Sequence, residues 1–481
     1  MKQKDFVFNI CLLVFLNLLV KPFWILGVDI GVQNRVGSDV YGLYFSILSF
    51  TMLFNMILDM GITNYNNRNI AQHSDRLSNQ FSNIITLRFA LGIIYFLAVF
   101  VVAAIIGYSK FHLKLLLWIA LNQFLNAFIL YVRSNISALM MFKTDSVISI
   151  LDKLLMILFC GILLWSNISK YQFQIEWFIW CQTVSYLITI AIAITIVLRK
   201  SYFVKPTFNW QSALSIIKNS FPFALVTFLM TCYYRLDSVM IERLLPNNVA
   251  AFQSGIYATA FRLFDTLAIV PYLFSVILLP LFSKMLKEKQ NILPITKTAF
   301  LLLSFFSLSA AIILFVYREP VIKLFYNDNI VQSVEVFELI IFGLVPLSFT
   351  YLFGTLLTAN GNLKYLNIIA AACLIINIIM NLILIPNYGA QGSAVASLIT
   401  QLSVCSLQFA FSLKILNIPF KTIQFTNIAA FALALFISTY LLCNYSGFNT
   451  IISLSISIIC AFFLSIVFRL FNIKDLQSFK S

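Results

Sequence analysis

The chain has 481 residues, of which 61% are hydrophobic and only 10% are charged. Soluble domains carry about 25% charged residues, so this composition excludes a soluble class and indicates many membrane crossings. Lys and Arg number 32 against 17 Asp and Glu, which gives a formal net charge of +15. In a soluble chain this excess would suggest nucleic acid, whereas in a membrane protein its meaning depends on which loops carry it.

Cysteine and histidine usage points away from metal and disulfide chemistry. The eight cysteines lie in apolar stretches without a C-x-x-C pair, and His73 and His112 are far apart in polar connections. We therefore predict no metal site, no disulfide framework and no cofactor. The first apolar run, 6–28, is too long for a signal peptide and lacks a small-residue cleavage site, so we expect it to be a membrane helix.

About fourteen apolar runs are long enough to cross roughly 30 Å of hydrocarbon. Their approximate spans are 6–28, 41–63, 84–107, 114–133, 144–166, 175–198, 220–245, 255–281, 297–317, 334–359, 364–386, 390–413, 422–443 and 448–469. With the N-terminus inside, twenty Lys and Arg fall on its side, six fall on the other side, and six lie within or at the edges of helices. The positive-inside rule then places both termini in the cytoplasm and explains most of the net charge without nucleic acid.

The chain also shows a weak internal repeat. Residues 8–44 aligned on 221–257 without gaps, at an offset of 213, are identical at eight of 37 positions. The identical pairs are Phe8/Phe221, Leu12/Leu225, Phe15/Phe228, Leu16/Leu229, Asn34/Asn247, Val36/Val249, Gly42/Gly255 and Tyr44/Tyr257. Both stretches begin on the predicted cytoplasmic side, which indicates parallel repeats related by an axis along the membrane normal.

We therefore predict an all-α polytopic membrane protein built from two parallel-repeat six-helix lobes. The predicted segments are an N-lobe at 1–198, a basic cytoplasmic linker at 199–219, a C-lobe at 220–415, and two further helices with a cytoplasmic tail at 416–481.

Five ionisable residues lie deep inside predicted helices, where charge is costly and usually functional. They are Lys21, Arg235, Asp237, Arg262 and Asp265. Arg235 and Asp237 are two residues apart and point about 200° away from each other, so they cannot neutralise each other. Arg262 and Asp265, at i and i+3, share a helix face and are able to pair. In the repeat, Lys21 aligns with the neighbour of Arg235, which puts a cation at nearly the same depth in each lobe.

The other charges in or near helices have simpler interpretations. We expect Arg88 to snorkel towards the cytoplasmic surface and Lys153 to anchor its helix or pair with the adjacent Asp152. We expect Glu242 and Arg243 to be surface residues at the outer end of their helix, at the membrane interface and close to water.

Three stretches resemble polysaccharide-export flippases. "VYGLYFSILSFTMLFNMILDMGITNYNNRNIA" (40–71) is similar to their second helix and the following loop. "RLDSVMIERLLPNNVAAFQSGIYATAFRLFD" (235–265) is similar to their seventh and eighth helices, and "NIIMNLILIPNYGAQGSAVASLITQ" (377–401) to the loop between the eleventh and twelfth. The chain thus resembles the oligosaccharide flippase branch of the multidrug/oligosaccharidyl-lipid/polysaccharide (MOP) exporter superfamily.

The resemblance implies two lobes around a central cavity that opens to one side at a time. It implies export of an undecaprenyl-pyrophosphate-linked oligosaccharide across the bacterial cytoplasmic (inner) membrane, coupled to protons or sodium if to any ion. Polysaccharide assembly proteins are possible partners, and no bond is made or broken, so no catalytic residue and no enzyme activity are expected. Related flippases use cations on helices one and eight, which on this chain match Lys21 and Arg262.

We predict that Lys21, Arg235 and Arg262 bind the pyrophosphate, because cations bind phosphate strongly at low dielectric. The supporting cavity residues are Trp24, Asn122, Tyr234, Asp237 and Asp265. Aromatic rings stack on sugars and amides bind hydroxyls, while Asp237 balances one of the cations.

Two other functions stay open. One is a cation-coupled multidrug antiporter of the same superfamily, which fits poorly with three buried basic residues. The other is a membrane glycosyltransferase or polysaccharide polymerase, which needs catalytic residues in large outer loops. The largest such loop, 318–333, offers Glu319 and Asp328 nine residues apart.

Overall fold

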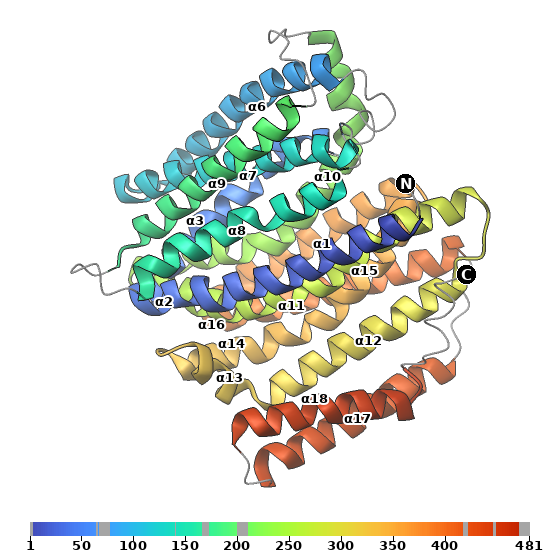
Figure 1. The fold of residues 1–481 in the computed structure, drawn as a ribbon. Coiled ribbons are helices and arrows are strands. Elements are labelled where there is room, and N and C mark those ends of the chain that lie inside the picture. The colour runs from blue at the N-terminus through green and yellow to red at the C-terminus, as the bar shows by residue number, and fades with distance from the viewer. Residues whose placement is uncertain are drawn as a thin grey trace. The chain divides into compact units, whose positions relative to one another are not determined.

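The structure is a computed structural model and describes residues 3–63, 66, 77–139, 141–165, 173–199, 210–416, 422–445 and 449–470. Its regular secondary structure in these ranges is helical throughout, as Figure 1 shows. The chain forms two compact units, 1–255 and 256–481, and each is described by itself. Of the predicted linker, residues 200–209 lie outside the described ranges, and the chain is helical again from Trp210. The predicted lobe boundaries stay a prediction.

The first unit contains the following elements: α1 (Gln3–Phe23), the π-helix η1 (Trp24–Asp29), α2 (Ile30–Val36), α3 (Ser38–Leu53), α4 (Asn55–Asp59), α6 (Leu77–Ile106), α7 (Lys110–Ala138), α8 (Phe142–Trp165), α9 (Ile175–Leu198) and α10 (Trp210–Leu244). The helix α11 (Asn247–Lys287) begins in this unit and continues into the second. Within the unit, α1 packs on α8, α7 on α9, and α3 on both α7 and α10.

The first predicted membrane helix changes its winding next to a proline. Pro22 lies inside α1, and η1 follows directly after Phe23. Proline removes one backbone donor and clashes with the preceding turn, and the wider π-turn accommodates such a defect. Lys21 therefore lies at the point where α1 gives way to η1. π-turns of this kind often mark functional sites.

The second unit contains α12 (Leu293–Val316), α13 (Arg318–Phe325), α14 (Ile330–Phe342), α15 (Leu344–Ala359), α16 (Leu363–Leu416), α17 (Thr422–Tyr445) and α18 (Thr450–Val467). Here α15 packs on α16, and α12 packs on α15 and α17. A core of Phe, Leu and Ile side chains from α11, α12 and α15 includes Phe282, Leu303 and Leu356, all fully buried.

The long element α16 is two helices joined at a sharp bend. Gly389 has φ 56° and ψ −132°, a backbone conformation accessible essentially only to glycine. After the bend, Ser393 Oγ donates a hydrogen bond to Asn381 Oδ1 at 2.9 Å. A Cβ on Gly392 would lie 2.4 Å from the carbonyl oxygen of Leu384. The chain therefore reverses tightly at this loop, and small residues let the two helices approach.

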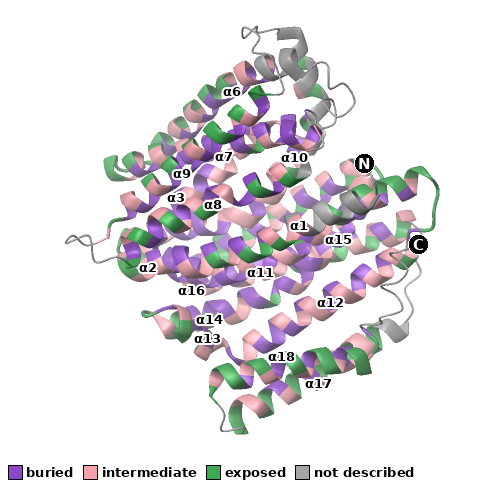
Figure 2. Ribbon diagram, in the orientation of Figure 1, coloured by how far each residue is buried: buried purple, intermediate pink, exposed green. Residues whose placement is uncertain are grey.

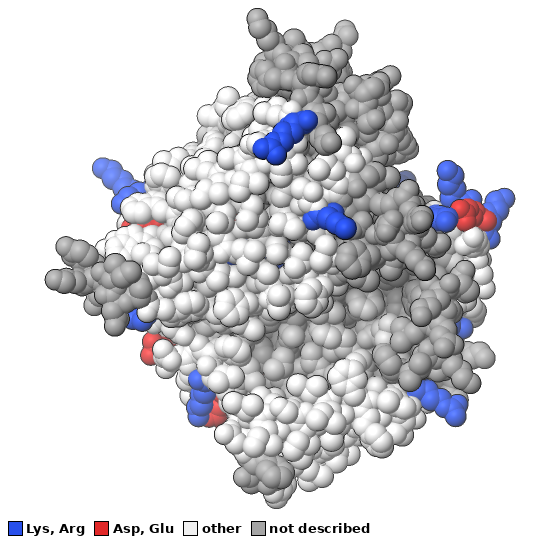
Figure 3. Space-filling view, viewed as in Figure 1, with Lys and Arg blue, Asp and Glu red and all other residues white. Residues whose placement is uncertain are grey.

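Twelve helices in the described ranges are long and apolar enough to cross a membrane. This count treats α16 as one helix. It omits the predicted span 41–63, which the structure divides at Phe54 into α3 and the short α4. Many large apolar side chains are exposed, among them Ile459 and Phe463 on α18. Figure 2 shows exposed residues in green, and α17 and α18 carry many of them. The face seen in Figure 3 carries charge mainly at its margins, as expected of a surface that faces lipid.

Candidate functional site

The first unit encloses a cluster of charged side chains around the end of α1. Lys153, Arg133 and Asp152 are the charged groups close enough to act on the ammonium of the half-buried Lys21. Lys153 Nζ lies 3.1 Å from Asp152 Oδ2, and Arg133 Nε lies 2.9 Å from Asp145 Oδ1. Three cations thus meet two carboxylates, which leaves one positive charge in excess.

Lys21 is the member of this cluster for which the described residues offer no hydrogen-bond or ion-pair partner. Lys153 and Arg133 each have a carboxylate, while Lys21 forms no hydrogen bond or ion pair with any residue in the described ranges. A cation removed from water beside two other cations is unfavourable unless an anion compensates it. The cluster is therefore suited to accept an anionic group at Lys21.

Aromatic rings line the same region. The ammonium of Lys153 lies 5.6 Å from the ring centroid of Trp24 and 5.4 Å from that of Tyr186. Trp24 stacks on Phe178 with centroids 5.8 Å apart and an interplanar angle of 8°. Tyr44 meets the edge of Phe178 at 5.4 Å. These contacts hold Trp24, which the sequence proposed as a cavity residue, between the cation cluster and α9.

Asn122 ties α7 to α9. Its Nδ2 donates to the carbonyl oxygen of Ile179 at 3.1 Å, and its Oδ1 accepts from Thr183 Oγ1 at 2.7 Å. Gln182 Nε2 on the same helix donates to the hydroxyl of Tyr44 at 3.1 Å. Asn122 is only 3% exposed. The structure thus shows a bridge between helices at this position, and its predicted contact with a glycan stays a prediction.

The predicted residues on α10 differ in burial. Arg235 is half-buried, with its guanidinium 5.3 Å from the centroid of the Tyr234 ring, whereas Asp237 is fully buried. That Arg235 and Asp237 point in different directions stays a prediction.

Arg262 and Asp265 are both half-buried on α11 in the second unit. Their predicted pairing stays a prediction, as does a single cavity that joins Arg262 to Lys21 and Arg235.

Two interpretations of charges outside the predicted site were wrong. Arg88 does not snorkel: it is 2% exposed, forms an ion pair with Asp59, and donates to Leu58 O and Thr63 Oγ1 at 2.7 Å each. Glu242 is not a surface residue either: it is 8% exposed and accepts a hydrogen bond from Ser46 on α3. In both cases a partner on another helix, which sequence spacing does not reveal, permits burial of the charge.

Sequence reasoning also missed two members of the Lys21 cluster. Lys153 was expected to anchor its helix, and its pairing with Asp152 is present, but its position between Trp24 and Tyr186 depends on three helices. Arg133 was the last residue of its predicted span, 114–133, whereas α7 continues to Ala138. The sequence did contain a signal for both residues, because Arg133 and Lys153 lie in two consecutive predicted helices, 114–133 and 144–166.

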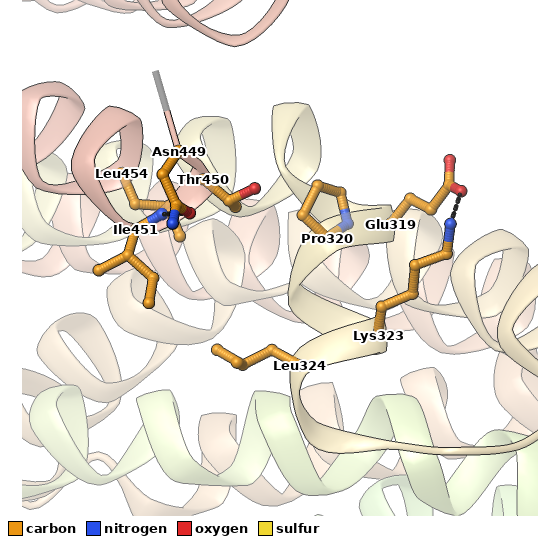
Figure 4. Close-up of a pocket in the computed structure, with 8 residues that line it drawn as sticks. All are labelled: Glu319, Pro320, Lys323, Leu324, Asn449, Thr450, Ile451 and Leu454. Atoms are coloured by element: carbon orange, nitrogen blue, oxygen red, sulfur yellow. Dashed lines mark hydrogen bonds and ion pairs between the residues drawn. The ribbon is translucent and has the colours of Figure 1, made fainter. Parts of the chain in front are cut away.

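A separate cavity of about 550 Å³ lies in the second unit between α13 and the start of α18 (Figure 4). Lys323 donates to Glu319 at its edge at 2.6 Å, and this bond and charge hold the pKa of Glu319 below its ordinary value. The carboxylate considered for a polymerase is thus paired and exposed. Within the described ranges, no group of three or more His, Cys, Asp or Glu side chains is placed to hold a metal ion.

These features define a multi-pass integral membrane protein with a buried cationic cluster. The chain belongs to the polysaccharide biosynthesis protein family, whose model matches residues 36–335. None of the curated protein sequences matches the chain at a significant level.

Solved structures show the same fold at low sequence identity. The lipid II flippase MurJ in an inward closed conformation matches with a TM-score of 0.66 and 16% identity, over 96% of each chain. A multidrug resistance MATE transporter of the MOP superfamily, inward-facing, matches with a TM-score of 0.60 and 12% identity, over 83% of this chain and 97% of its own. A MOP superfamily transporter from Pyrococcus furiosus matches with a TM-score of 0.55 and 13% identity, over 84% and 95%. The fold is therefore that of the MOP superfamily of transporters.

Proposed function

We propose that the chain is a flippase that moves an undecaprenyl-pyrophosphate-linked oligosaccharide from the cytoplasmic to the outer leaflet by alternating access. In this proposal it crosses the bacterial cytoplasmic membrane fourteen times, with both termini inside and two six-helix repeats around a central cavity. The lipid tail stays in the bilayer while the pyrophosphate and glycan pass through the cavity.

The observation that carries the proposal is the ammonium of Lys21, which has no partner among the described residues and lies beside Lys153 and Arg133. A pyrophosphate is a compact multivalent anion, and its binding would offset the excess positive charge of this cluster. The rings of Trp24 and Tyr186 lie next to the same cations and are buried in this structure, so we expect sugar stacking on them only after the cavity opens. Organic cations, the substrates of a multidrug antiporter, would meet electrostatic repulsion at this position.

The test is a deletion strain that carries plasmid copies of the gene. Loss of the protein should accumulate lipid-linked oligosaccharide in the cytoplasmic leaflet, measured by enzymatic labelling of the glycan in oriented membrane vesicles. Lys21→Ala and Lys21→Gln should reproduce the accumulation at normal membrane levels, whereas Lys21→Arg should restore export because it keeps the charge. The exposed Lys110, replaced by Ala, serves as the matched control and should export normally.

Normal export by both neutral Lys21 variants would refute the cationic site. Normal glycan translocation in the deletion strain would refute the flippase, and drug sensitivity alone would favour the antiporter. Shortened glycan chains with intact translocation would favour a polymerase.

A further inference from the structure

Glu242 is the centre of a buried polar network that joins three parts of the first unit. Ser46 Oγ on α3 donates to Glu242 Oε2 at 2.9 Å, and the hydroxyl of Tyr108 donates to the same oxygen at 3.3 Å. His112 Nε2 lies 3.5 Å from Glu242 Oε1, and Arg243 Nη2 lies 3.2 Å from that oxygen. One carboxylate on α10 thus contacts α3, the connection between α6 and α7, and the start of α7.

The rings around the carboxylate hold its partners in place. The guanidinium of Arg243 lies 4.0 Å from the ring centroid of Tyr108. The imidazole of His112 stacks on the same Tyr108 ring, with the two centroids 5.2 Å apart. Phe50 on α3 meets the edge of Tyr108 at 5.3 Å. Burial raises the pKa of Tyr108 above its ordinary value, and the charge of Glu242 raises it further, so the phenol stays a neutral donor.

His112 contributes the imidazole of this network. Imidazole is the side chain that ordinarily gains or loses a proton between about pH 5 and 8. Its Nδ1 lies 2.5 Å from Ser109 Oγ, so a neutral ring accepts from this hydroxyl and a protonated ring donates to it. The second nitrogen faces Glu242 in both states. The His112 side chain is 26% exposed, which gives protons access from water.

The charge balance of the network depends on that proton. With neutral His112, Glu242 faces one cation, Arg243, and with protonated His112 it faces two. Ser46 and Tyr108 contribute neutral donors from the other packed elements. The remaining charged groups of the connection, Lys110 and Lys114, are exposed. Protonation therefore adds an ion pair between α7 and α10 that neutral imidazole does not supply.

Near this end of α10, both α10 and the following helix α11 make further hydrogen bonds to α2 and α3. Ser254 Oγ, at the start of α11, donates to the carbonyl oxygen of Gly42 at 3.1 Å, and Gln33 Nε2 donates to Gly255 O at 3.3 Å. Ser46 Oγ also reaches the carbonyl oxygen of Ser238 at 3.3 Å. In the proposed flippase, the helix over 220–245 moves with the second repeat, so this contact must open on the outer side.

We propose that His112 and Glu242 form a proton-sensitive latch that holds the seventh membrane helix, α10, against the fourth, α7, on the outer side, where α10 also contacts the second, α3. A proton taken up from the outside strengthens the latch and favours the outward-closed state. The loss of this proton weakens the latch and favours opening. The proposal rests on the proposed alternating access for its orientation, and it assigns the proton as the ligand that regulates the outer opening.

Distance measurements on purified protein in lipid nanodiscs test the latch without any substrate. Spin labels are placed on Lys114→Cys at the start of α7 and Asn247→Cys at the start of α11, both exposed positions, in a background without native cysteines. Double electron–electron resonance is recorded at pH 6 and pH 8.5. We expect the ratio of the short to the long distance to be roughly fivefold higher at pH 6, equivalent to about 1 kcal/mol for a partly exposed ion pair.

The variants separate the latch from a general effect of pH. His112→Gln keeps a hydrogen-bond donor but cannot titrate, so its distances should not change with pH, and Glu242→Gln should show the same independence with a larger open population. His112→Lys, a permanent cation, should stay closed at both pH values. The chain's other histidine provides the matched control, because His73→Gln should respond to pH as the unchanged chain does.

Unchanged distances between pH 6 and 8.5 in the chain with His112 would overturn the proposal, even if every variant failed to fold. A pH response that persists in His112→Gln would overturn it as well. The readout is independent of transport, so normal export by Lys21→Ala would refute the flippase site and leave the latch result standing.

Discussion

Gly42 and Gly255 approach each other so closely that neither position has room for a side chain. A Cβ on Gly42 would lie 2.1 Å from Ala251 O, and a Cβ on Gly255 would lie 2.1 Å from Ser38 O. The repeat offset of 213 relates Gly42 to Gly255 and Ser38 to Ala251. Gly42 thus contacts Ala251, and its repeat equivalent Gly255 contacts Ser38, the repeat equivalent of Ala251. A two-fold axis between repeats produces reciprocal contacts of this kind. The contact therefore supports the proposed parallel repeat.

Replacement of either glycine by alanine should destabilise the protein. The atoms in the way belong to the backbone and cannot rotate aside, so Gly42→Ala and Gly255→Ala should lower the free energy of unfolding by about 1–3 kcal/mol. Thermal unfolding in detergent measures the effect. Gly27→Ala is the control, because its Cβ would meet only the Phe23 ring at 3.8 Å. Equal stability of all three variants would contradict the close contact.

Loss of Arg88 should destabilise the fold without a direct effect on a substrate site. Arg88→Ala removes an ion pair and two hydrogen bonds, and we expect it to lower the free energy of unfolding by about 3 kcal/mol. This value is the lower end for a buried pair, because the Asp59 side chain is 36% exposed. Arg88→Lys should restore little, because one ammonium cannot replace the guanidinium contacts with Leu58, Asp59 and Thr63. The measurement is denaturant unfolding followed by tryptophan fluorescence.

The comparison variant for Arg88 is Lys323→Ala, which breaks the exposed pair with Glu319. Exposed pairs contribute at most about 1 kcal/mol, so this change should be nearly silent. Similar losses for the two variants would argue against a structural role for the Arg88 pair.

A double substitution distinguishes the two possible roles of Lys153. Lys153→Gln leaves Asp152 without its partner and should reduce both stability and export, whereas Asp152→Asn with Lys153→Gln removes both charges and should recover stability. If Lys153 also binds the phosphate, export stays at least about tenfold below normal in the double variant, the loss expected for about 1.4 kcal/mol of binding. Full recovery of export would show that Lys153 only balances Asp152.

The bend in α16 should depend on glycine at two positions for different reasons. Gly389→Ala forces a side chain into a conformation that costs about 1–3 kcal/mol, and Gly392→Ala places a Cβ 2.4 Å from Leu384 O. Both should lower the yield of folded protein, measured by size-exclusion chromatography of a fluorescent fusion. Gly31→Ala, with only a Leu164 methyl at 3.5 Å, should behave normally. Normal folding of Gly389→Ala would mean that the chain turns here by another route.

The sequence by itself determined the membrane class, the helical fold and most helix positions, because a lipid bilayer requires long apolar helices with internally paired backbones. The bend at Gly389 was also readable, since proline and glycine act through local backbone geometry. Lys21 was also identifiable as a candidate from local sequence alone, because it is a charge in an apolar run beside Pro22.

Only the tertiary structure decided which charges meet. Arg88 and Asp59 are 29 residues apart, Glu242 and Ser46 are 196 apart, and Lys153 reaches Trp24 and Tyr186 from a third helix. Helix packing sets these encounters, and residue spacing along one helix carries no information about a neighbour across the bundle. The physical difference is that hydrophobicity acts residue by residue, whereas the burial of a charge depends on a partner that the fold supplies.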